Sequence, residues 1–209
     1  MLDSILEEKL DIYLLGGAVM AISGLKVGTK DIDVIVEHKK DHRNLISSLE
    51  KCGYLLLQPQ DLSKPYVELS ATALQNREGF RWEVFVEYVA KKLALTSTVR
   101  KRATEIYSGD KLTVFRLSNE DLFLMKAMTE RDRDLEDMSI LARSGLDYEI
   151  ILHECISQSQ MDPRGNIWES SLYEKCLELK KVYGIEVPFL EELEKISIRK
   201  MMSNKRKRH

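Results

Sequence analysis

The chain has 209 residues, of which 44% are hydrophobic and 32% charged, and its formal net charge is −2. This length and apolar share predict one large or two small domains with a hydrophobic core, and the balanced charge excludes a global basic field that would attract nucleic acid. No apolar run is long enough to span a membrane, the acidic N-terminus lacks a signal-peptide pattern, and three widely spaced cysteines argue against disulfides or a zinc site, so we expect a cytoplasmic protein.

Strand and helix signals alternate over the first 116 residues, where glycine and polar turns separate short apolar runs. Helices are predicted at 4–10, with Ser4 as the cap, at 18–22 and at 41–52. Strands are predicted at 12–15, 32–37, 54–57, 66–69 and 80–89. Two further strand segments, 106–107 and 112–115, flank Ser108-Gly109-Asp110, which is a hairpin signal.

The pattern changes at Ser118, where a capping box begins and the strand signals fade. Helices are predicted at 119–129, 131–143, 148–158, 167–183 and 188–202. The expected fold is therefore α+β: a mixed β-sheet domain with flanking helices (1–116), followed by a C-terminal helical bundle (117–203). A basic tail at 204–209 is expected to be disordered.

The most informative feature is a pair of aspartates, Asp31 and Asp33, beside a run that is otherwise β-branched and apolar. This composition predicts a buried strand, and residues two apart on a strand point to the same face. Two carboxylates placed there would repel each other and would be costly to bury. A divalent cation removes that cost, and Mg²⁺ prefers hard oxygen ligands. The alternative is a plain ion network with Lys30 and Arg81.

A glycine pair, Gly16-Gly17, lies between a predicted strand and a predicted helix upstream of the aspartates. Glycine lets the backbone come close to a ligand, and the N–H groups of a helix N-terminus attract phosphate. Together with the aspartates, the glycines predict a site for a metal-bound triphosphate. Two Mg²⁺ ions need a further carboxylate, for which Glu83 and Glu87 are the candidates, unless Glu83 is an exposed edge residue.

The glycines and the aspartates together match a known signature. Leu15-Gly16-Gly17, a spacer of thirteen residues and Asp31-Ile32-Asp33-Val34 resemble the motif of the nucleotidyltransferase superfamily, which has the DNA polymerase β-like fold. Over most of its length the chain is also similar to stand-alone nucleotidyltransferases related to abortive-infection toxins and the toxins of toxin–antitoxin systems. The matching blocks are 16–19, 24–25, 29–33, 81–86, 120–122, 126–127 and 131–137. That family usually has Asp at the place of Glu83.

The resemblance implies a role for each matching residue. Asp31, Asp33 and Glu83 would hold two Mg²⁺ ions, and Glu83 would also act as the base for an acceptor hydroxyl. The residues that would bind the nucleotide are Gly16, Gly17, Thr29, Lys30, Lys126, Asp134 and Asp137. Among these, Lys126 would reach the phosphates from the helical domain, and the two aspartates would position it or the acceptor.

The implied reaction is Mg²⁺-dependent transfer of a nucleoside monophosphate from an NTP to an acceptor hydroxyl. The acceptor could belong to tRNA or other RNA, to a protein or to a small molecule such as an aminoglycoside. Among these, the basic runs at 100–102 and 205–208 mildly favour RNA. A toxin role would bring an antitoxin protein as a partner. Two other classes stay open: an inactive nucleotide-binding sensor, and an antitoxin-like interaction protein that keeps the fold.

Several of these residues also have purely structural interpretations. Lys126 could simply extend its ammonium to solvent from a helix. The charged run at 130–137 is, by default, a solvated helix face with i,i+4 ion pairs. The basic run at 100–102 fits a solvated helix turn better than a nucleic-acid contact.

Overall fold

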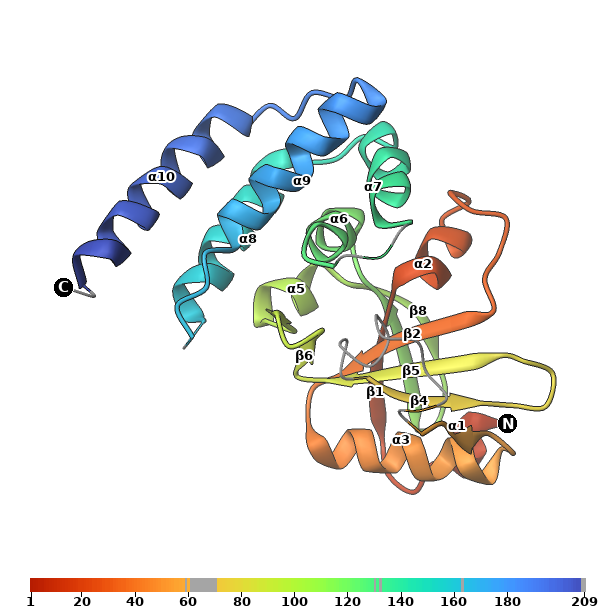
Figure 1. The fold of residues 1–209 in the computed structure, drawn as a ribbon. Coiled ribbons are helices and arrows are strands. Elements are labelled where there is room, and N and C mark those ends of the chain that lie inside the picture. Colours follow the sequence, from red (N-terminus) through yellow and green to blue (C-terminus); the bar gives the residue numbers. More distant parts are fainter. Residues whose placement is uncertain (59, 61–70, 130, 132, 163, 208–209) are drawn as a thin grey trace. The chain divides into compact units, whose positions relative to one another are not determined.

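The structure is a computed structural model that describes residues 1–58, 60, 71–129, 131, 133–162 and 164–207. The chain divides into two compact units, Met1–Ser118 and Asn119–His209. The first unit is mixed α and β, and the second is helical (Figure 1). The predicted α+β fold, a mixed sheet with flanking helices followed by C-terminal helices, is confirmed.

One mixed β-sheet forms the first unit, with the strand order β3-β4-β5-β2-β1-β9-β8 along its main path. β2 and β5 are parallel, as are β1 and β9, whereas β2 runs antiparallel to β1 and β4 runs antiparallel to β5. The short strands β6 and β7 form a hairpin that extends from β5. The strands are β1 (Leu10–Leu15), β2 (Asp31–Val36), β3 (Leu55–Leu56), β4 (Thr72–Gln75), β5 (Arg81–Val86), β6 (Tyr88–Val89), β7 (Leu93–Ala94), β8 (Thr104–Ser108) and β9 (Leu112–Arg116).

Helices flank this sheet and complete its core. They are α1 (Leu2–Ile5), α2 (Gly16–Ile22), α3 (Lys39–Lys51) and α5 (Ser97–Arg102). Helix α3 packs against β1, β2 and β5 through an apolar face on which Leu45 and Leu49 are buried. Helix α2 packs against β1 and β2. Because the sheet's central strands are covered, the apolar residues of β2 after Asp33 are fully buried, and the two aspartates lie near the start of the strand.

The chain's start differs from the prediction of a helix at 4–10. Helix α1 ends at Ile5, and β1 already begins at Leu10 because residues 10–14 pair with β9 and residues 13–15 pair with β2. Ser4 does not cap the helix; its hydroxyl donates to the carbonyl oxygen of Met1 at 2.9 Å. The strand predicted at 66–69 lies outside the described residues.

The strand predicted at 80–89 is interrupted. β5 ends at Val86, and Glu87 has a φ of +63°, a left-handed backbone that a β-ladder does not accommodate. The chain then turns into the β6–β7 hairpin, whose turn residues Ala90 and Lys91 also have positive φ. The basic run at 100–102 forms the last turn of α5, as expected, and Arg100 pairs there with Glu37.

The second unit consists of helices in its described part (Figure 1). They are α6 (Asn119–Ala127), α7 (Asp134–Arg143), α8 (Tyr148–Met161), α9 (Trp168–Tyr183) and α10 (Leu190–Lys207). Asp147 caps α8 by accepting hydrogen bonds from the backbone N–H groups of Glu149 and Ile150, and Gly184 ends α9 in the left-handed conformation. Helix α7 begins later than the predicted residue 131.

Helix α10 runs to Lys207, so residues 204–207 are helical where a disordered tail was predicted. Lysine and arginine are good helix formers, and cations are favourable near a helix C-terminus, which gives a physical reason for this continuation. Arg208 and His209 lie outside the described residues. None of the helices in the described part of the chain combines the length and apolar character that crossing a bilayer requires.

Candidate active site

The predicted carboxylates meet on two neighbouring parallel strands of the first unit. In the register of β2 and β5, Asp31 lies beside Arg81 and Asp33 lies beside Glu83. Side chains in register on parallel strands share a face of the sheet, as do residues two apart on one strand. Asp33 is 5% exposed and Glu83 only 1%, so Glu83 is not an exposed edge residue. The sheet therefore brings three carboxylates and one guanidinium together on one face.

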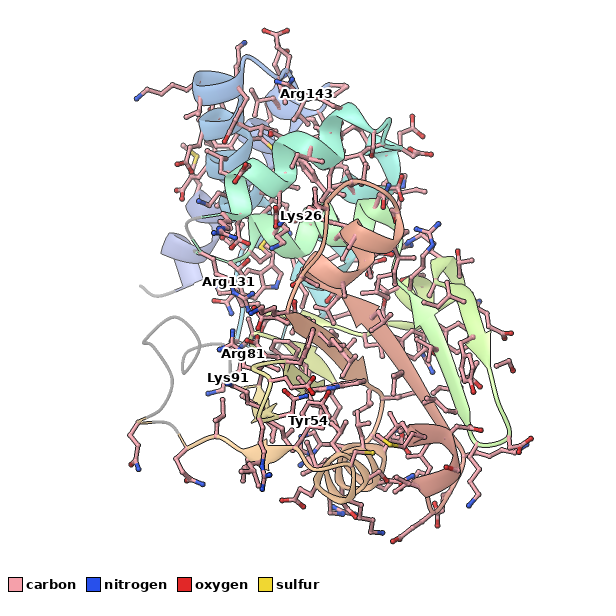
Figure 2. All side chains as sticks on the ribbon, turned by 90° about the vertical axis from the view of Figure 1, so that its right-hand side faces the viewer. Lys26, Tyr54, Arg81, Lys91, Arg131 and Arg143 are labelled. Atoms are coloured by element: carbon pink, nitrogen blue, oxygen red, sulfur yellow. The ribbon has the colours of Figure 1, made fainter. Side chains whose placement is uncertain are left out.

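Arg81 contributes a cation to this group (Figure 2). Its Nη2 and Nε atoms lie 3.0 Å and 3.1 Å from Oδ1 of Asp31, and Nε lies 3.4 Å from Oε1 of Glu83. The ion network that the sequence left as an alternative for Asp31 and Asp33 is thus present at Asp31, with Arg81 as the partner, while Lys30 is exposed. The arginine side chain is only 18% exposed, and these carboxylates compensate its charge.

The glycine turn lies directly against Asp33. Gly16 is the first residue of α2 and has a φ of +65°, and a Cβ built on it would lie 2.0 Å from Oδ2 of Asp33 and 2.9 Å from its Cγ. Only glycine allows both this backbone conformation and this close approach. The turn formed by Gly16 and Gly17, called the glycine elbow below, and the candidate metal ligand Asp33 are therefore neighbours in space, although they belong to different segments of the sequence.

Gly17 and Thr29 continue the same arrangement. A Cβ on Gly17 would lie 3.4 Å from Oγ1 of Thr29. The Thr29 hydroxyl accepts a hydrogen bond from the backbone N–H of Asp31 and donates to its carbonyl oxygen, both at 3.1 Å. This loop contact fixes the start of β2 beside the elbow. The structure thus brings Gly16, Gly17, Thr29 and the two aspartates together.

Magnesium suits these donors in chemistry, because three carboxylates supply the hard oxygen ligands that it prefers. A cation already bridges two of them, namely the Arg81 guanidinium between Asp31 and Glu83. In the described part of the chain no three acidic, histidine or cysteine side chains converge closely enough to hold a metal ion as they stand. Metal binding would therefore require these carboxylates to move closer together.

The register also separates the two candidates for the third carboxylate. Glu83 lies on β5 next to Asp33, whereas Glu87 is exposed and lies beyond the end of β5. Sequence alternation alone placed both residues on one face, because it could not show that the strand stops at Val86. Glu83 is therefore the carboxylate that lies beside Asp33, the residue that packs against Gly16.

The helical unit contains a separate charged cluster. The Lys126 ammonium on α6 lies 2.8 Å from Oδ1 of Asp134 and 2.9 Å from Oδ2 of Asp137 on α7. Both aspartates are almost completely buried, so the solvated-face interpretation does not hold for them. Burial acts to lower the pKa of Lys126, but the two aspartates outweigh it and raise that pKa above its ordinary value. Asp134 also accepts a hydrogen bond from the backbone N–H of Arg131, which accounts for the late start of α7.

One member of the site, Arg81, was not predicted as a functional residue. The sequence placed it only in a plain ion network. A signal was available: Arg81 is two residues before Glu83, so the alternation that puts Asp31 on the face of Asp33 also puts Arg81 on the face of Glu83.

Comparison with known proteins identifies a family for the chain. A family model described as a nucleotidyltransferase of unknown function (DUF6036) matches residues 3–161, which include the elbow, all three carboxylates and the Lys126 cluster. The chain belongs to this nucleotidyltransferase family. No curated protein matches the chain. The match to the nucleotidyltransferase family spans the sheet of the first unit and the helices of the second through α8.

Proposed function

We propose that the protein is a Mg²⁺-dependent nucleotidyltransferase that moves a nucleoside monophosphate from an NTP to an acceptor hydroxyl. The observation that carries this proposal is the contact between the Asp33 carboxylate and the Gly16 elbow, with Glu83 in register beside Asp33. Family membership supports the reaction class. A protein that only needed a tight turn would not require a buried carboxylate against it.

In the proposed reaction the acceptor oxygen forms a bond to the α-phosphorus of the NTP, and the bond from that phosphorus to the β-phosphate oxygen breaks. Pyrophosphate leaves, and the proton of the acceptor hydroxyl goes to a carboxylate oxygen of Glu83. Glu83 suits this role because it is buried beside Asp33 and can be held in one orientation by Arg81. Positioning of the reactants supplies a large share of such catalysis.

Asp31, Asp33 and Glu83 would hold the metal. When bound, Mg²⁺ would neutralise charge on the phosphates and lower the pKa of the attacking hydroxyl. Gly16 and Gly17 leave the elbow without side chains, which supports their role in receiving the triphosphate next to Asp33. Thr29 holds the start of β2 in place, and Lys30 is exposed at that same point. The part of Lys126, Asp134 and Asp137 in the reaction stays a prediction from the resemblance.

The acceptor and the biological setting belong to the proposal as well. The acceptor hydroxyl belongs to RNA, to a protein or to a small molecule, and RNA is included because Lys101 is exposed in the basic last turn of α5. A cytoplasmic location is consistent with three free cysteines. A toxin role with an antitoxin partner rests on the sequence resemblance. The toxin role is tested by expressing the protein in cells: the wild type should arrest growth, and Asp33→Ala should not.

One assay separates the proposed enzyme from the two other classes. The protein is incubated with each α-labelled NTP, Mg²⁺ and either total RNA, a protein extract or aminoglycosides. Transfer of label to one of these acceptors supports the nucleotidyltransferase. Saturable binding of an NTP without transfer identifies a nucleotide sensor, and neither transfer nor binding identifies an interaction protein on the same fold.

A further inference from the structure

Arg81 makes contacts beyond the one to Glu83 that the proposed reaction uses. Its backbone N–H donates to the carbonyl oxygen of Lys30 at 3.0 Å, and its guanidinium reaches Asp31 at 3.0 Å and Glu83 at 3.4 Å. The backbone and the guanidinium of Arg81 are therefore both held in place on the face that carries the candidate metal ligands. Three carboxylates gather on that face, and two of them are almost completely buried.

A buried group of like charges is costly unless a cation compensates it. The guanidinium of Arg81 supplies such a cation, and a divalent ion would supply another. The guanidinium contacts Oδ1 of Asp31 through two nitrogens, so a metal ion held by Asp31 would compete with Arg81 for this carboxylate. Two cations close to one carboxylate also repel each other.

We propose that Arg81 is a displaceable counterion: it holds Asp31 and Glu83 in place before the metal arrives, and it releases Asp31 when the metal binds. This inference rests on the metal site of the proposed function and adds a positioning residue to it. Arg81 then sets how tightly the site binds metal, because each binding event must break its contact with Asp31. A purely structural Arg81 would instead keep that contact in every state.

The test uses Arg81→Gln and measures stability and metal binding, without any turnover. In the presence of EDTA, Arg81→Gln lowers Tm by about 5–10 °C, because the carboxylates lose the guanidinium that compensates them. Titration with Mn²⁺, followed by the loss of the free-ion EPR signal, shows at least about tenfold tighter binding to Arg81→Gln than to the wild type, because no positive charge has to leave. Saturating Mn²⁺ restores most of the lost Tm.

Arg77→Gln is the matched control, because Arg77 is an exposed arginine in the turn that precedes β5, and the substitution makes the same change in charge. It leaves both Tm and Mn²⁺ affinity near the wild-type values. Arg81→Lys covers the case in which the glutamine variant does not fold. Lysine keeps the charge but loses the two-nitrogen contact, and its Mn²⁺ affinity falls between those of the wild type and the glutamine variant.

Unchanged or weaker Mn²⁺ binding by Arg81→Gln, or by Arg81→Lys if only that variant folds, would overturn the proposal. An unchanged Tm in EDTA would overturn it as well. A double-mutant cycle with Asp31→Asn adds a second criterion: the Tm loss caused by Arg81→Gln shrinks when Asp31 is already neutral. Label transfer is measured separately, so a protein that binds Mn²⁺ in this way but transfers no nucleotide would refute the proposed reaction and leave the role of Arg81 standing.

Discussion

The Oδ2 atom of Asp33 lies 2.0 Å from the point that a Cβ on Gly16 would occupy. Gly16 also has a φ of +65°. The two residues therefore constrain each other: the carboxylate can lie where it does only if the elbow has no side chain. Because β2 fixes the backbone of Asp33, a side chain at Gly16 would push the carboxylate away from its place beside Glu83.

We predict that Gly16→Ala abolishes nucleotide transfer and lowers stability. Alanine in the left-handed conformation costs about 1–2 kcal/mol, and displacing the Asp33 carboxylate removes a metal ligand in addition. Gly24→Ala is the control, because Gly24 has a φ of +71° but a Cβ added to it would meet no atom within 4 Å. Both variants should lose several degrees of Tm, and only Gly16→Ala should lose transfer. Equal activity of the two variants would show that the Gly16–Asp33 contact has no catalytic consequence.

A second prediction decides between the two candidates for the third carboxylate. Glu83→Gln should lower the rate of transfer at least about 100-fold, the range expected for loss of a general base. Glu87→Gln should stay within a few-fold of the wild type, because Glu87 is exposed beyond the end of β5. Single-turnover rates with one labelled NTP measure both. The opposite ranking would move the third ligand to Glu87 and remove Glu83 from the site.

The cluster in the helical unit gives a stability prediction that is independent of activity. Lys126→Met leaves Asp134 and Asp137 buried without the lysine's charge, so the free energy of unfolding should fall by about 3–5 kcal/mol in urea denaturation. Lys195→Met, at an exposed position of α10, should change it by less than about 0.5 kcal/mol. Adding Asp134→Asn and Asp137→Asn to Lys126→Met should recover part of the loss. A loss that the added substitutions deepen would contradict the ion-pair explanation.

The pKa of Lys126 fixes how this contribution depends on pH. That pKa is raised in the folded state, so the stabilisation is fully present below the unfolded value and is lost as the pH rises through the folded value, which lies above 10.5. The difference in stability between the wild type and Lys126→Met should therefore be constant from neutral pH to about pH 10 and should shrink above it. A difference that vanished near neutral pH would contradict the assignment.

Most of the fold could be predicted from local patterns, because the central strands are apolar runs with clear breaks. β4 (Thr72–Gln75) could not, since its four residues become a strand only through pairing with β5 and β3. The end of β5 could not be predicted from the sequence either. Glu87, Ala90 and Lys91 adopt positive φ without the glycine or asparagine that normally marks such a turn.

The candidate site, like the fold, could be predicted only in part from the sequence. Spacing on one strand predicted that Asp31 and Asp33 share a face. The glycine pair between a strand and a helix predicted a phosphate site, and the resemblance selected Glu83 over Glu87. What no local pattern could show is the register of β2 against β5, which pairs Asp33 with Glu83 and Asp31 with Arg81. The burial of Asp134 and Asp137 was equally out of reach, because a charged run on a helix has the same spacing whether it faces solvent or a neighbouring lysine.

The most direct test of the proposed function compares Asp33→Ala with the wild type in the α-labelled NTP assay. Asp11→Ala, an exposed aspartate on β1, is the control. We expect the wild type and Asp11→Ala to transfer label to the acceptor, and we expect Asp33→Ala to transfer none while it unfolds as cooperatively as the wild type. Full transfer of label by a folded Asp33→Ala would contradict the assignment of this carboxylate, and with it the active site proposed for the protein.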